Sequence, residues 1–132
     1  MTNIEISGAA PRLSRRDVSA FARKVLLASG EDIGEMSIAF VDDATMRNLN
    51  RKFRGKNKTT DVLTFPGEDA CEIVISVDRA RIQAQNEKHS LATELRYLLV
   101  HGILHGLGYD HEKDDGEMND LEVAVREKVG LD

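Results

Sequence analysis

The chain has little of several residue types that mark particular classes of protein. Among its 132 residues there are one cysteine, Cys71, no tryptophan and two prolines. A single cysteine excludes an internal disulfide and is typical of a reducing compartment. A lone cysteine in a strand-like run is usually a small buried hydrophobe. We therefore expect a cytoplasmic protein whose fold depends on its core and not on cross-links.

Long hydrophobic runs are also missing. The longest apolar stretch, around residues 97–107, contains two histidines and is well short of the ~20 residues that cross a bilayer. The N-terminus lacks a basic start followed by an apolar core, so we expect neither a signal peptide nor a membrane partner. With 31% charged and 41% hydrophobic residues, the composition predicts a single globular domain over residues 1–132.

Charge is distributed unevenly along the chain. The net charge of −5, taken alone, argues against a nucleic-acid partner. However, residues 47–58 contain six basic side chains and no acidic one, whereas residues 110–132 contain nine acidic and three basic. A local basic patch can steer a polyanion whatever the total charge.

Periodicity predicts an α+β fold, or α/β with a small mixed sheet. The strongest signal follows Ser90, where Leu91, Leu95, Leu98 and Leu99 begin an apolar face broad enough for a buried helix. We expect one compact domain, with a small mixed β-sheet packed with helices around this central, metal-bearing helix. The expected strands cover 3–7, 36–41, 62–65 and 72–77, and the expected helices begin after Ser14, Asp42 or Asp43, Asp78, Ser90 and Asp114.

Three of the four histidines fall within eleven residues, in HGILHGLGYDH. His101 and His105 lie four apart on the expected helix, so both imidazoles share one face. Gly106 and Gly108 permit the chain to reverse, which brings His111 back toward them. Three imidazoles with an open fourth position indicate one catalytic zinc ion per chain, although other first-row divalent ions also accept imidazole.

The same spacing occurs in the metzincin proteases, HExxHxxGxxH, with one difference. Gly102 stands where those enzymes have their general-base glutamate. Without that proton shuttle, peptide hydrolysis is disfavoured. A peptidase would need a base from elsewhere, and Glu94 and Glu112 are the glutamates nearest in sequence. Glu94 lies about two turns before His101, which makes it a poor candidate.

Two further residues near the motif have weaker assignments. His89 precedes the expected cap at Ser90, and we interpret it as an exposed loop residue. Asp110 could orient a ligand imidazole, or it could be an ordinary turn carboxylate.

A cationic, turn-rich segment covers residues 53–61. Arginine offers a planar fork for phosphate oxygens and lysine adds positive field. A charge run alone is more often a solvated surface loop, but its combination with the histidine motif favours phosphate binding. The basic side chains concerned are Arg51, Arg54, Lys56 and Lys58.

The two segments together, HGILHGLGYDH and LNRKFRGKNKTTDVLTFP, resemble the YbeY family of bacterial rRNA maturation factors. The resemblance implies an α+β fold, three histidines on one zinc ion, and a functional arginine at Arg54. It also implies a single-strand endoribonuclease in 3′-end maturation of small-subunit (16S) rRNA and in ribosome quality control. The implied partners are rRNA, the small ribosomal subunit, a small-subunit ribosomal protein and an Era-type GTPase.

The sequence departs from the family pattern at several positions. Thr59 replaces a proline and Asn57 an aspartate, while Cys71 and Glu72 replace the usual Gly-Asp. These changes concern the loop and the strand after it, and they leave the histidines unchanged.

Our mechanistic hypothesis is zinc-assisted phosphodiester hydrolysis. Arg54 would neutralise charge in the transition state, and Arg51, Lys56 and Lys58 would hold flanking phosphates. Only Phe53 and Phe65 lie near the loop, so we expect weak base stacking. Two alternatives stay open: a metzincin-like zinc metalloprotease, and a non-enzymatic ribosome assembly factor with a structural zinc.

Overall fold

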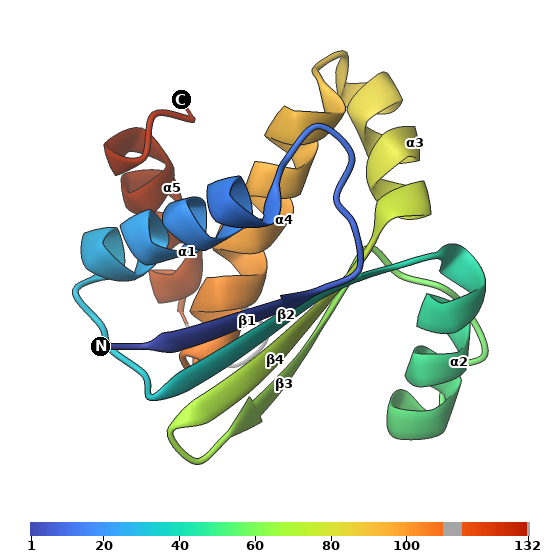
Figure 1. Ribbon diagram of the computed structural model, residues 1–132, viewed down its shortest axis with the longest axis horizontal. Helices are drawn as coiled ribbons and strands as arrows, with labels where there is room; N and C mark the ends of the chain where they lie inside the picture. Colours follow the sequence, from blue (N-terminus) through green and yellow to red (C-terminus); the bar gives the residue numbers. More distant parts are fainter. Residues whose placement is uncertain (110–114, 132) are drawn as a thin grey trace.

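The computed structural model describes residues 1–109 and 115–131, and in this part of the chain four strands form one mixed sheet. The order across the sheet is β1-β2-β4-β3. Five helices connect and cover the strands (Figure 1). The strands are β1 (Asn3–Ser7), β2 (Glu35–Val41), β3 (Val62–Gly67) and β4 (Ala70–Ser76), and the helices are α1 (Arg15–Ser29), α2 (Asp43–Arg54), α3 (Val77–Glu87), α4 (Leu91–Gly106) and α5 (Glu117–Lys128). The predicted α+β class is confirmed.

Among the strands of the described residues, β3 is the only antiparallel one, and it lies at the edge of the sheet. Strands β1, β2 and β4 run parallel, and β3 pairs with β4 through a hairpin whose turn is Glu68–Asp69. A parallel connection needs a crossover, which α1 provides between β1 and β2. A two-residue turn joins antiparallel neighbours directly.

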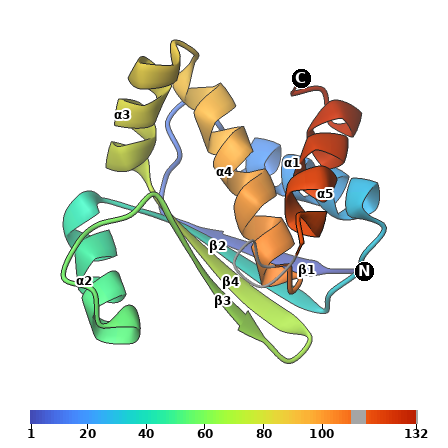
Figure 2. The ribbon, with the colours of Figure 1, turned by 180° about the vertical axis from the view of Figure 1, so that it is seen from behind.

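The two faces of the sheet have different covers. Side chains alternate along β2, so that Met36, Ile38 and Phe40 are buried under α1 and α4. Helix α2 packs on the opposite face, where Met46 joins Leu63 and Val74 in a second small core. Figures 1 and 2 show α1, α4 and α5 on one side of the sheet and α2 on the other.

Helix α4 packs closely on the sheet because two of its residues have no side chain. A Cβ at Gly102 would lie 2.7 Å from Cγ2 of Ile73, and one at Gly106 would lie 2.9 Å from Sγ of Cys71. Gly106 is therefore the last residue of the helix and a point of close approach, not the reversal that we expected. Gly108, with φ +108°, has the conformation that a reversal requires.

The caps agree with the expected starts of α1, α2 and α4 but not with that of α3, and α5 begins after Gly116, which makes no side-chain cap bond. Ser14, Asp42 and Ser90 cap their helices through their side chains, but Ser76, not Asp78, caps α3. Asp78 instead accepts a hydrogen bond from the backbone N–H of Asp43, which ties α3 to α2. None of the helices in the described residues is long and apolar enough to cross a membrane.

Candidate active site

His101 and His105 lie one turn apart on α4, and both are half-buried. Their rings are nearly parallel, with an interplanar angle of 15° and centres 6.3 Å apart. With nitrogen–zinc bonds of about 2.1 Å, the centre of each bound ring would lie roughly 3 Å from a shared ion. Around a tetrahedral ion two such centres would lie about 5 Å apart, so the rings lie about 1 Å further apart than shared binding requires.

The third predicted ligand, His111, lies outside the described residues, as do Asp110 and Glu112. Within residues 1–109 and 115–131, no group of three or more histidine, cysteine, aspartate or glutamate side chains is arranged to hold a metal ion. His101 and His105 supply two neutral nitrogen donors, which suit zinc and other first-row divalent ions. The donor chemistry present fits the predicted site.

A carboxylate that the sequence analysis missed contacts His101. Oε1 of Glu122, on α5, lies 2.7 Å from Nδ1 of His101. This hydrogen bond is the main reason that the pKa of His101 is raised above its ordinary value; burial opposes the shift, and the charges of Glu122 and Asp61 add to it. A signal was present in the sequence, because Glu122 adjoins the apolar stripe of Met118, Leu121 and Val125.

Gly102, between the two histidines, faces the sheet. Its Cα points toward Ile73 and Val62, whose Cγ2 atoms would lie 2.7 and 3.3 Å from an added Cβ. A glutamate at this position would therefore begin inside the core and not beside the histidines. The fold thus argues against the protease alternative on packing grounds, beyond the absence of the residue.

Arg54 is connected to the histidine helix through one residue of β3. Its Nη2 donates a hydrogen bond to the carbonyl oxygen of Thr64 at 3.1 Å. The buried hydroxyl of Thr64 donates in turn to the carbonyl oxygen of Gly102 at 3.5 Å. Arg54 and helix α4, which carries the histidines, are therefore both bonded to Thr64 of the edge strand, from different elements.

The basic loop is held by polar groups of α2. The buried side chain of Asn50 donates to the backbone carbonyl oxygen of Lys58 at 2.9 Å, and the backbone carbonyl of Asn50 accepts from the N–H of Lys56 at 3.3 Å. At the far end, the Thr59 hydroxyl donates to Oδ1 of Asp43 at 2.9 Å. Thr59, which stands in place of the family's proline, thus anchors the loop with a hydrogen bond.

The other three basic residues that were predicted to bind phosphates, Arg51, Lys56 and Lys58, lie on the surface. Arg51 is exposed and donates to Asn48 on its own helix at 3.1 Å. Lys56 and Lys58 are exposed in the loop that follows Arg54. Together with Arg54 they form one basic surface from the end of α2 to the start of β3.

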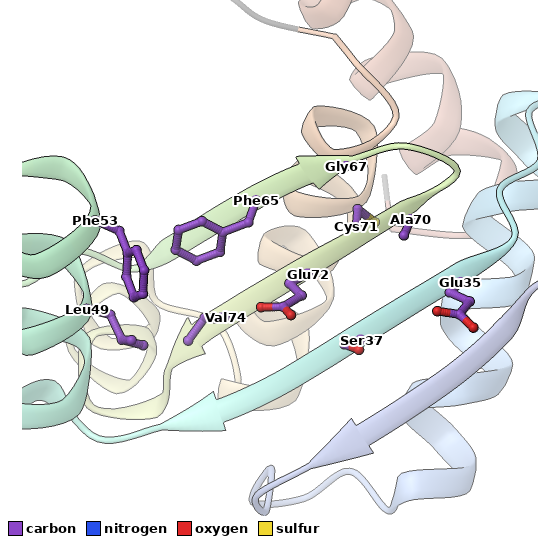
Figure 3. Close-up of a pocket in the computed structure, with 10 residues that line it drawn as sticks. All are labelled: Glu35, Ser37, Leu49, Phe53, Phe65, Gly67, Ala70, Cys71, Glu72 and Val74. Atoms are coloured by element: carbon purple, nitrogen blue, oxygen red, sulfur yellow. The ribbon is translucent and has the colours of Figure 1, made fainter.

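A hollow of about 570 Å³ lies on the α2 side of the sheet, away from α4 (Figure 3). Phe53 and Phe65 meet there edge to face, with ring centres 5.5 Å apart. The strands contribute the carboxylates of Glu35 and Glu72 to its lining. These carboxylates would repel a phosphate backbone, so this hollow is not the candidate site.

His89 is more enclosed than we expected from its place before Ser90. Its Nε2 lies 2.6 Å from Oε1 of Glu94, and its side chain is 26% exposed. The ring also stacks on Tyr97, with centres 5.5 Å apart. His89 does lie in the loop before α4, as predicted, but it is only partly exposed, because the buried carboxylate of Glu94 holds the ring against α4.

Comparison with known proteins gives consistent matches over nearly the whole chain. The model of a family described as endoribonuclease YbeY matches residues 3–130. An endoribonuclease YbeY of Koribacter versatilis is 42% identical over 122 residues, covering 90% of this chain and 80% of that protein. One from Aquifex aeolicus is 41% identical over 129 residues, covering 89% and 86%.

A solved structure matches as well. The solution structure of TM1509 from Thermotoga maritima aligns with a TM-score of 0.68 and 28% sequence identity. The alignment covers 96% of this chain and 89% of the other.

Proposed function

The chain belongs to the YbeY family of endoribonucleases, and from this premise we propose that it cleaves single-stranded rRNA by zinc-assisted hydrolysis. The biological substrate is the 3′ end of small-subunit (16S) rRNA, in maturation and in ribosome quality control. The observation that carries the assignment is the link from Arg54 through Thr64 to Gly102. It joins a phosphate-binding cation to the helix that bears the histidines.

His101, His105 and His111 are the residues that would hold one zinc ion. A zinc ion bound there supplies Lewis-acid chemistry, polarising a phosphoryl oxygen and making water more acidic. The half-buried imidazoles of His101 and His105 provide neutral donors on a helix fixed against the sheet. The chain's own contribution is to hold these donors rigidly.

Arg54 stabilises negative charge that develops on the phosphate. Its hydrogen bond to Thr64 uses one N–H of the guanidinium, which has five. That bond fixes the group in place before substrate binds, and a preorganised cation costs little reorganisation during the reaction. Arg51, Lys56 and Lys58 bind flanking phosphates and contribute affinity without sequence choice.

The test is cleavage of a labelled precursor of the 16S rRNA 3′ end, single-stranded and annealed to its complement. We expect cleavage of the single strand alone, loss with a chelator, and recovery with zinc. Arg54→Ala should lower kcat by ~10²–10³ with a small change in KM, and Lys56→Ala should mainly raise KM. Arg16→Ala, an exposed change on α1, is the control. Wild-type rates for both Arg54→Ala and His105→Ala would refute the mechanism.

We further propose that the enzyme acts in the cytoplasm on the small ribosomal subunit, with a small-subunit ribosomal protein and an Era-type GTPase as partners. The support is family membership. Co-sedimentation of the purified protein with small subunits, repeated with each candidate partner removed, tests the proposal. If the protein stays at the top of the sucrose gradient, separate from the small subunits, in every case, the proposal is contradicted.

A further inference from the structure

Glu122 carries a charge in a largely buried position, which is unfavourable unless a partner compensates for the lost hydration. Helix α5 buries Met118 and Val125 against the core, and Glu122 lies four residues after Met118, on that side of the helix. Its side chain is only 13% exposed. Carboxylates are rarely this enclosed unless they are paired, because burial removes their hydration.

The contact that Glu122 makes selects one ring nitrogen of His101. An ionised carboxylate is only an acceptor, so Nδ1, at 2.7 Å, must be the donor. When Nδ1 carries the proton, the lone pair of the neutral ring is on Nε2. A metal ligand needs such a lone pair, and a hydrogen bond from the other nitrogen both fixes the ring and increases its basicity.

The chain contains a second histidine–glutamate pair for comparison. His89 and Glu94 meet at 2.6 Å, but through Nε2 and within five residues of each other at the start of α4. That pair closes the turn between α3 and α4. The pair of His101 and Glu122 joins two helices over 21 residues of sequence, at the predicted metal site.

We propose that Glu122 is a positioning residue, which holds His101 as the Nδ1–H tautomer so that Nε2 can bind the metal ion. This proposal rests on the proposed function, because it assumes that His101 is a ligand. In this role Glu122 acts through its hydrogen bond to His101. Glu122 lies outside the histidine motif HGILHGLGYDH, which ends at His111.

The experiment measures zinc affinity of the full chain by competition with a chromophoric chelator. Glu122→Gln keeps the shape and removes the charge, and we expect zinc binding to weaken 10–100-fold. Glu94→Gln is the matched control, since it removes the charge from a similar bond on α4 and should change zinc affinity less than twofold. Equal affinities for wild type and Glu122→Gln would overturn the proposal.

A second measurement needs no variant. In the metal-free wild-type protein, ¹H–¹⁵N correlation spectra at a pH where the imidazole is neutral should show His101 as the Nδ1–H tautomer. An Nε2–H tautomer would overturn the proposal even if Glu122→Gln fails to fold. If wild type binds no zinc, the proposed function fails, while the tautomer still decides what Glu122 does to the ring.

Discussion

Adding a methyl group at Gly102 tests whether the sheet sets the position of the histidine helix. The new Cβ would lie 2.7 Å from Cγ2 of Ile73 and 3.3 Å from Cγ2 of Val62. Ile73 is fully buried in the middle of the core, so it has little room to move. Overpacking of this kind costs about 2–3 kcal/mol. Alanine regains about 1 kcal/mol of helix propensity over glycine. We therefore expect Gly102→Ala to lose a net ~1–2 kcal/mol of unfolding free energy.

Gly106→Ala provides a matched comparison within the same helix. There the closest atom is Sγ of Cys71, at 2.9 Å, which can rotate away, and Cβ of Cys71 at 3.1 Å needs to shift by only a few tenths of an ångström. Overpacking and helix propensity should then nearly cancel, for a net change of about 0–1 kcal/mol. The assay is urea unfolding followed by far-ultraviolet circular dichroism, with unchanged m-values as the check for two-state behaviour. The packing argument is refuted if Gly102→Ala is as stable as wild type, or if Gly106→Ala costs more.

Gly102→Glu extends the test to the protease pattern. Besides the overlap with Ile73, the carboxylate would enter an apolar region without a partner, which adds several kcal/mol. The total approaches the ~5–15 kcal/mol that stabilises a typical domain. We expect insoluble or unfolded protein. A soluble, folded variant that hydrolyses casein would show that our placement of residue 102 is wrong.

Two further predictions concern residues that depart from the family pattern. Burial, and then the charge of Glu72, raise the pKa of the Cys71 thiol to about 11, so the folded thiol stays protonated where an unfolded one, near 9.0, ionises. The free energy of unfolding should therefore fall as the pH rises from about 9 to 11. At pH ~9 a thiol reagent should react roughly 50-fold more slowly with the folded than with the unfolded protein. Equal reaction rates would contradict this prediction. Thr59→Ala removes the hydrogen bond to Asp43 and should cost about 1 kcal/mol in urea unfolding and weaken RNA binding. Thr59→Ser, which keeps the hydroxyl, should match wild type, and an equal loss in both variants would count against the anchor.

Local signals in the sequence predicted most of the fold. The strands, the caps at Ser14 and Ser90 and the buried face of α4 follow from residue type and spacing, which act over a few residues. The site was predictable to the same extent: spacing alone placed His101 and His105 on one face. The motif also showed that Gly102 replaces a glutamate.

The remaining features depend on which elements meet in space. Nothing local indicates that Arg54 bonds to Thr64. The apolar stripe beside Glu122 marks that residue as enclosed, but it does not show that Glu122 reaches His101 across 21 residues. Gly106 was misinterpreted for the same reason, because its role is set by Cys71 on a strand that is distant in sequence. These contacts join residues that are far apart in the chain, so no short stretch of sequence can reveal them.

The carboxylates on the α2 side of the sheet have a consequence for how the molecule meets a polyanion. Register places Glu5, Ser37 and Glu72 side by side across three strands, with Glu35 one step along the same face. The basic surface at the end of α2 lies beside this acidic one, so the two form an electric dipole. In the field of an RNA strand such a dipole experiences a torque that turns the lysines toward the strand before contact. The strand register, by aligning the carboxylates, thus helps to orient the protein as it diffuses toward RNA. Added salt shortens the Debye length and so weakens this orienting effect.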